Sequence, residues 1–195
     1  HHRQLIVHKY QFADNLLVFY QAVSPSRIFQ RNPFSNLHFN FTSGDRAGYL
    51  RWIEGYRPVV KGNSVTWKKS ARRDDSYDNF RRYLDTVFMY AGSYSLSREL
   101  HPVQSLDDVR IGDIFIKGGF PGHAVLVVDM AISEKSGQTA ILLAQSFMPA
   151  QEIHVLLNLG HSRKNPWYIV EAADRLYTPE WTFEWTDLKR FAGSD

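Results

Sequence analysis

The sequence of 195 residues contains no cysteine, and this absence excludes several kinds of chemistry at once. A chain without cysteine has no disulfide, no thiolate ligand for a metal and no cysteine nucleophile. Long apolar runs are also missing, since none approaches the roughly 20 residues that a membrane-spanning helix needs. No apolar core of a signal peptide is present either, which predicts a cytosolic or already processed chain without a transmembrane segment.

The remaining composition is typical of one folded domain. Hydrophobic residues make up 44% of the chain and aromatic residues 14%, values that suit a packed core and not a disordered chain. A chain of this length forms one ordinary domain, and no internal repeat or linker divides it. We therefore expect a single domain over residues 3–195, with His1 and His2 set aside as the remnant of a tag.

The formal net charge of +3 is distributed unevenly. Residues 1–100 contain 15 Lys and Arg against 8 Asp and Glu, a net of +7, and residues 101–195 contain 8 against 12, a net of −4. The asymmetry indicates either a basic face for an anionic polymer or two halves that attract each other or differ in surface. No arginine-rich stripe with interleaved aromatic residues is present, so we expect no nucleic-acid partner.

Helical periodicity precedes strand-like patterns along the chain. Apolar residues recur at helical spacing over residues 10–23 and again over residues 77–91, where Asp74, Asp75 and Ser76 form an acidic, capping start. A hairpin is expected over residues 58–67, with its turn at residues 61–63. A last helical turn is expected at residues 186–191. Short apolar runs predict strands over residues 114–116, 124–128, 139–144, 152–157 and 166–170. This order predicts an α+β fold.

The stretch at residues 112–129 contains the strongest candidate for a functional side chain. It has the pattern of two strands joined by the turn at residues 118–122, which is rich in glycine and contains proline. His123 comes at the first position of the second strand, beside the turn. Catalytic side chains tend to be mounted at such strand ends, although a histidine there can also simply close the turn.

Gln145, at the end of the next expected strand, is a natural partner for His123. On adjacent antiparallel strands the two side chains can come side by side, and the amide can then hold one tautomer of the imidazole. Such a system also needs a nucleophile at a helix start, where a thiol pKa is lowered. In this sequence the start of the first helix contains Gln11, Phe12, Ala13 and Asp14, with no nucleophile.

Several segments resemble a bacterial family known as domain of unknown function 4846, found mainly in exported proteins. The resemblance covers nearly the whole chain. Its segments are HFNFTSG at residues 38–44, Trp52 with GYR at 55–57, the stretch at 112–129, AQSFMPAQ at 144–151 and TPEWTF at 178–183. The resemblance implies an exported protein of the bacterial cell envelope or periplasm.

The order of parts in that family is similar to papain-like cell-wall amidases and peptidases of the NlpC and CHAP kind. Those enzymes have a cysteine at a helix start, Gly-His at a strand start and a polar residue on the next strand. The resemblance implies an α+β, papain-like antiparallel sheet with an N-terminal helix packed on it. It also implies that His123 is the general base, that Gln145 orients it, and that Phe12 occupies the nucleophile slot of the family pattern Gln-Cys-Ala-Asp.

Phenylalanine has no ionisable group and cannot attack a carbonyl. The resemblance therefore implies a domain that binds a peptide or peptidoglycan-type ligand without cleaving it, with Gln11, Gly122, Ser146 and Trp52 as ligand-binding residues and without cofactor or metal. Phe12 also lies on the apolar face of its expected helix, where it is equally a core anchor.

Two other functions stay open at this point. One is an active amidase or peptidase with a non-cysteine nucleophile, although Ser146 would point to the opposite face of its strand from Gln145. The other is a structural interaction domain in which the cleft has no role.

Three weaker site types are also considered. Asp113 and Asp129 could act as paired carboxylates on a sugar, although Asp113 suits a turn cap. His38, His123 and His154 could form a metal site with a carboxylate, although the histidines of residues 3–195 lack the local spacing of metal ligands. Sugar rings could also stack on aromatic side chains, here Trp52, Tyr56, Trp167, Trp181 and Trp185.

Overall fold

The computed structural model describes residues 37–146, 153–160, 165–171 and 175–191, and strands predominate within them. Strands account for 37% of these residues and helices for 23%. The α-helices of the described residues are α3 (Tyr49–Ile53), α4 (Tyr77–Tyr90) and α5 (Ser93–Glu99), with two single 3₁₀ turns, η2 (Leu106–Asp108) and η3 (Trp185–Asp187). None of these helices has the length and apolar character needed to cross a bilayer.

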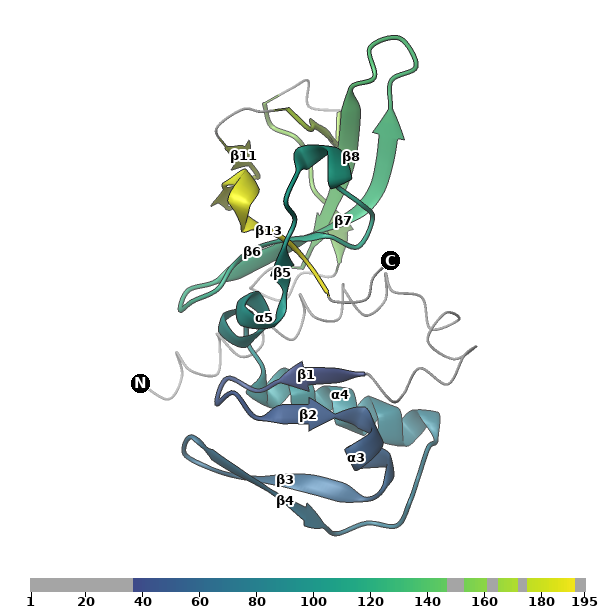
Figure 1. Cartoon of the computed structure of the whole chain (residues 1–195), viewed down its shortest axis with the longest axis vertical. Coiled ribbons are helices and arrows are strands. Elements are labelled where there is room, and N and C mark those ends of the chain that lie inside the picture. The colour runs from purple at the N-terminus through teal and green to yellow at the C-terminus, as the bar shows by residue number, and fades with distance from the viewer. Residues whose placement is uncertain (1–36, 147–152, 161–164, 172–174, 192–195) are drawn as a thin grey trace.

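A seven-stranded antiparallel sheet is the largest element (Figure 1). Its order is β10-β8-β7-β6-β13-β5, and β9 pairs with β8. The strands are β5 (His101–Pro102), β6 (Ile114–Lys117), β7 (His123–Ile132), β8 (Thr139–Gln145), β9 (His154–Val155), β10 (Trp167–Ile169) and β13 (Leu188–Arg190).

Three two-stranded antiparallel sheets complete the described structure. They pair β1 (His38–Asn40) with β2 (Arg46–Gly48), β3 (Tyr56–Lys61) with β4 (Ser64–Lys69), and β11 (Leu176–Tyr177) with β12 (Thr182–Phe183). Figure 1 shows the first two of these with α3 and α4 at one end of the molecule, the large sheet at the other end, and α5 between them. The predicted hairpin around Gly62 and Asn63 is thereby confirmed as β3 and β4.

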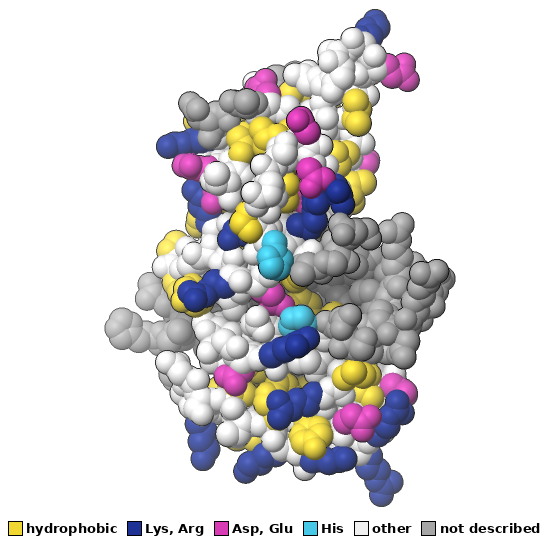
Figure 2. Space-filling view, in the orientation of Figure 1, with side chains coloured by type: hydrophobic (Ala, Val, Ile, Leu, Met, Phe, Trp, Pro, Cys, Tyr) yellow, Lys and Arg dark blue, Asp and Glu magenta, His cyan; other side chains and the backbone are white. Residues whose placement is uncertain are grey.

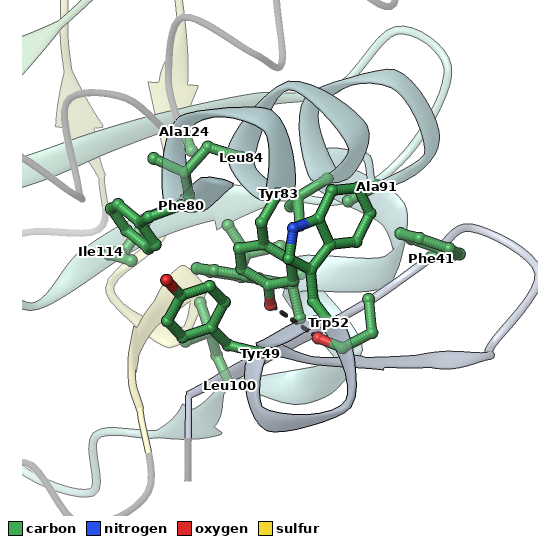
Figure 3. Packing of buried hydrophobic residues seen from close by; sticks show 14 of the residues in the cluster. Phe41, Tyr49, Trp52, Phe80, Tyr83, Leu84, Ala91, Leu100, Ile114 and Ala124 are labelled. Carbon is green, nitrogen blue, oxygen red and sulfur yellow. Dashed lines mark hydrogen bonds between the residues drawn. The ribbon is translucent and has the colours of Figure 1, made fainter. Parts of the chain in front are cut away.

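The central strands are buried on both faces because their apolar residues run without interruption. Ile114, Ile116 and Leu126 belong to a core that also contains α3 and α4, while Phe115 and Val125 belong to a second core with β11, β12 and β13. Successive strand residues point to opposite faces, so a continuous apolar run supplies both cores. Figure 3 shows the first core, with side chains of α4 packed toward Ile114 and Ala124.

Helix α4 forms where the capping pattern predicted it. The Ser76 hydroxyl accepts a hydrogen bond from the Asn79 amide at 3.2 Å, which satisfies one of the free N–H groups of the first turn. Phe80, Leu84 and Val87 recur at helical spacing and are buried. The helix therefore packs one apolar face against the sheet, and its prediction is confirmed.

The prediction of a papain-like α+β fold with an N-terminal helix packed on the sheet is wrong. Residues 186–191 were expected to be helical. Instead, the 3₁₀ turn η3 ends at Asp187, and the next three residues form β13, which lies between β6 and β5 in the large sheet. Strands β1 to β4 likewise fill much of the region between the expected helices. The helix expected at residues 10–23 lies outside the described residues. Among the described residues, β-sheets are the main elements of the fold.

Candidate functional site

His123 is the first residue of β7, as predicted, and is fully buried. Lys117 and His123 pair across the end of the β6–β7 hairpin. The turn between them lies against the start of α5, where a Cβ added to Gly122 would come 2.1 Å from Ser93 Oγ, and one added to Gly118 would come 2.0 Å from Ser97 Oγ. Only glycine permits this close approach, so the turn holds the imidazole on a rigid support.

A continuous chain of hydrogen bonds joins three polar side chains at this edge of the second core. His123 Nε2 lies 2.7 Å from Gln145 Oε1, and Gln145 Nε2 donates to Glu180 Oε2 at 2.7 Å. Because a carboxylate only accepts, the amide nitrogen of Gln145 faces Glu180 and its carbonyl oxygen faces the imidazole. His123 therefore carries its hydrogen on Nε2 when neutral, which places the basic lone pair on Nδ1.

Strand register explains why His123 and Gln145 meet. Leu126 pairs with Ala144 across β7 and β8, which leaves His123 and Gln145 as diagonal neighbours toward the end of the pair. The two residues lie on the face of Val125 and Leu143 because strand side chains alternate. The juxtaposition that the order of strands predicted is thus present.

Aromatic rings form the apolar surroundings of the imidazole. The Trp181 ring stacks on it with a centroid separation of 5.2 Å and an interplanar angle of 13°, and the Phe183 ring lies 6.2 Å away at 28°. Both come from the β11–β12 connection and β12, next to Glu180. One short segment therefore supplies the end of the hydrogen-bond chain and the rings that cover it.

Burial lowers the pKa of His123 below its ordinary value of 6.5. The hydrogen bond with Gln145 and the negative charge of Glu180 oppose this shift, because both favour the protonated ring. A neutral imidazole with its lone pair on Nδ1 can accept a proton or a hydrogen bond near neutral pH. The arrangement is thus suited to a general base or to an acceptor for a ligand N–H group.

Of the other predicted ligand-binding residues in the described structure, two adjoin His123 or Gln145 in the sequence and one lies on α3. Ser146 directly follows Gln145 and is buried, and Gly122 forms the close contact with Ser93. Trp52 lies on α3, where its indole nitrogen donates to the Asn79 side-chain oxygen at 2.9 Å. Its described contacts belong to the first core, near α4 (Figure 3).

Two predicted site residues cannot be placed in the same way. Gln11 and Phe12 lie outside the described residues, so the expected position of Phe12 opposite His123 stays a prediction.

Glu180 was not singled out as a site residue from the sequence. It lies in TPEWTF, one of the segments that carry the family resemblance. A local turn holds it, since Thr178 Oγ1 donates to the Trp181 carbonyl at 2.7 Å and accepts from the Trp181 amide at 3.2 Å. The spacing of 35 residues between Gln145 and Glu180 offers no local pattern from which their contact could be read.

The alternative polar groups have separate surroundings. Asp113 is held by Arg190, and Asp129 accepts from the Met130 amide at 2.8 Å. His38 lies 3.4 Å from a carboxylate oxygen of Glu99. Within the described residues, no group of three or more His, Cys, Asp or Glu side chains is arranged to hold a metal ion.

Comparison with known proteins gives one match. The model of a family described as domain of unknown function (4846) matches residues 7–190, nearly the whole chain. No curated protein and no solved structure matches the chain.

Proposed function

The chain belongs to the family of domain of unknown function 4846, and we propose that it binds a peptide or peptidoglycan-type ligand beside His123 without cleaving it. The observation that carries this proposal is the hydrogen-bond chain from His123 through Gln145 to Glu180. The proposed site has an imidazole oriented by a polar side chain, as in amidases of the NlpC and CHAP kind, but the fold differs from the papain-like fold of those enzymes.

The hydrogen-bond chain supports a site that handles a proton or an N–H group. Burying His123 and Gln145 is costly unless each is paired, and a structural role would be met equally well by apolar residues. Here the pairing also selects one tautomer and directs the lone pair of Nδ1 away from Gln145.

The absence of cysteine supports binding over cleavage. An imidazole base needs a nucleophile to activate, and the start of the first predicted helix offers Phe12 where the family pattern has a thiol. A ligand bound beside this site would then be released unchanged.

Binding can be tested by titrating histidine-labelled protein with soluble muropeptides and following the imidazole signals by NMR. We expect the His123 signals to shift and the mass of the muropeptide to stay unchanged. The variant His123→Ala should lose the binding, and the matched variant His101→Ala, which alters an exposed histidine of β5, should keep it. Equal binding by both variants would contradict the proposal.

A second candidate function is a hydrolase with a non-cysteine nucleophile. The observation that favours it is the hydrogen bond between the buried His123 and Gln145, since an imidazole whose pKa is lowered by burial can also activate water or a hydroxyl group. Release of muropeptide fragments that is lost in His123→Ala and kept in His101→Ala would establish this function in place of simple binding.

A further inference from the structure

We propose that the outward face of the β3–β4 hairpin is a binding surface for a linear, phosphate-bearing polymer. This surface, the basic hairpin face, consists of Lys61, Ser64, Thr66 and Lys68, extended by Arg72 beyond the strand. It belongs to a different sheet from His123, and the proposal does not rest on the function proposed for that residue.

The first support is the local charge. The 18 residues at 56–73 contain six Lys or Arg and no Asp or Glu. Figure 2 shows Lys and Arg side chains gathered at the end of the molecule where Figure 1 places α3, β3 and β4. Positive charge of this density attracts polyanions and raises their local concentration.

The second support is that most of these charges are not neutralised within the described structure. Arg73 forms ion pairs with Glu54 and Asp75. Among the described residues, Lys61, Lys68 and Arg72 form no ion pair with a carboxylate, and each is exposed. Their charges therefore remain available to an external anion.

The geometry of the hairpin places the exposed groups in a line. Lys61 pairs with Ser64, and Ser64, Thr66 and Lys68 follow one another on the same face of β4 because alternate strand residues share a face. All four side chains are exposed. Lys61 and Ser64 therefore lie at the turn end of this face and Lys68 at its other end, with Thr66 between them. Val59 and Arg57 share the face, and the Arg57 guanidinium donates to Asn79 Oδ1 at 2.9 Å.

The opposite face of the hairpin anchors it to the rest of the molecule. The Trp67 ring stacks on Phe41 at 6.1 Å, and the guanidinium of Arg51 lies 4.9 Å from the Trp67 ring centre. The centre of the Tyr56 ring lies 5.6 Å from the Arg51 guanidinium and 5.8 Å from Lys69 Nζ. These contacts hold the aromatic rings beneath the hairpin, so its outward face offers charge and hydroxyls and no ring for base stacking.

These features together indicate the chemistry of the partner. Lys, Arg, Ser and Thr side chains are the usual donors to phosphate oxygens, and the row of groups along a strand suits an extended chain. A bilayer surface fits less well, because the turn at Gly62 and Asn63 presents no apolar side chain for insertion. A phosphate-bearing linear polymer is therefore the partner that we infer.

The test uses long-chain inorganic polyphosphate as the probe, with binding measured by fluorescence anisotropy over a series of salt concentrations. The wild-type chain should bind, and log K should fall linearly with log salt. The triple variant Lys61→Gln, Lys68→Gln, Arg72→Gln should bind roughly tenfold or more weakly and should lower the salt slope by about 2 to 3.

The matched control removes three positive charges elsewhere, in Arg98→Gln, Lys135→Gln, Arg175→Gln, and should bind polyphosphate like the wild type. Equal weakening in both triple variants would overturn the proposal, because net charge would then explain the binding. Equal affinity of the wild type for polyglutamate, or binding to anionic lipid vesicles without binding to polyphosphate, would overturn the choice of a phosphate polymer.

Discussion

At the scale of single residues, burial keeps the imidazole of His123 neutral, while Gln145 and Glu180 both favour its protonated form. Gln145 offers its carbonyl oxygen to the ring and its amide nitrogen to Glu180, so the carboxylate acts on His123 through the amide. Burial alone would keep the ring neutral at still lower pH. Glu180 is thus a positioning residue that fixes the amide and moderates the shift.

The variant Glu180→Gln tests this role. We expect the pKa of His123 to fall further below its ordinary value, because the negative charge that favours the imidazolium is removed. An NMR titration of the ring carbons measures the change. Glu184→Gln, which alters an acidic residue in an exposed ion pair nearby, should leave the titration unchanged. A rise in the pKa in Glu180→Gln would contradict the arrangement.

The proposed nucleophile slot makes a second prediction at this scale. In Phe12→Cys the new thiol should have a depressed pKa, because an adjacent imidazole stabilises a thiolate. The rate of alkylation with iodoacetamide as a function of pH measures that pKa. The same thiol in a protein that also carries His123→Ala should titrate near its ordinary value of about 8.5. Ordinary titration in both proteins would remove Phe12 from the site.

At the scale of elements, the short strand β13 is held in the sheet by a buried ion pair between Arg190 and Asp113. Arg190 Nε donates to Asp113 Oδ1 at 2.6 Å and its Nη2 donates to Asp113 Oδ2 at 2.8 Å. Asp113 is 1% exposed and Arg190 15% exposed, so water screens the pair little. Asp113 also accepts from the Arg110 amide at 2.9 Å, as its predicted turn-capping role requires.

Removing Arg190 should destabilise the fold strongly. In Arg190→Ala the Asp113 carboxylate would stay buried without its cation, a change that typically costs about 3–5 kcal/mol. Urea unfolding followed by circular dichroism gives the free energy of unfolding. The matched change Arg175→Ala removes an exposed ion pair with Glu184 and should cost less than about 1 kcal/mol. Similar losses in the two variants would mean that β13 is held by packing alone.

At the scale of the whole molecule, the large sheet separates two cores that carry different features. One core packs α3 and α4 against the sheet, next to the basic hairpin, and the other contains the rings around His123. Residues 37–100, which supply the hairpin and α4, contain 11 Lys and Arg against 7 Asp and Glu. Anion attraction and the imidazole site therefore occupy different parts of one structure.

The buried imidazole makes the stability of the molecule depend on pH. Because the pKa of His123 is lowered in the folded state, the unfolded chain binds a proton first as the pH falls below about 6.5. The free energy of unfolding should then decrease with falling pH by up to about 1.4 kcal/mol per pH unit until the folded-state pKa is reached, and His123 should contribute no slope well above 6.5.

Urea unfolding of the wild type and of His123→Gln between about pH 5 and 8 measures this contribution as a difference between the two curves. The difference removes the effects of other groups, such as Glu99, whose pKa is raised by burial. His101→Gln, at an exposed position, should follow the wild type. Parallel curves for the wild type and His123→Gln would show that His123 is not shifted.

The sequence by itself determined the elements whose signals are local. Helix α4 follows from the Ser76 cap and its apolar spacing, the β3–β4 hairpin from its turn, and His123 at the start of β7 from the glycine-rich turn before it. The pairing of His123 with Gln145 also followed from the order of strands, because adjacent antiparallel strands bring their ends together.

Only the tertiary structure decided the features that depend on distant contacts. The papain-like fold was wrong because residues 188–190 gain more from pairing with β6 and β5 than from continuing a helix, and no local pattern records that gain. Glu180 and Trp181 reach the imidazole only because a separate small sheet packs on the second core. Hydrogen bonds and ring contacts between segments far apart in the chain form only when the chain folds, so local residue spacing does not predict them.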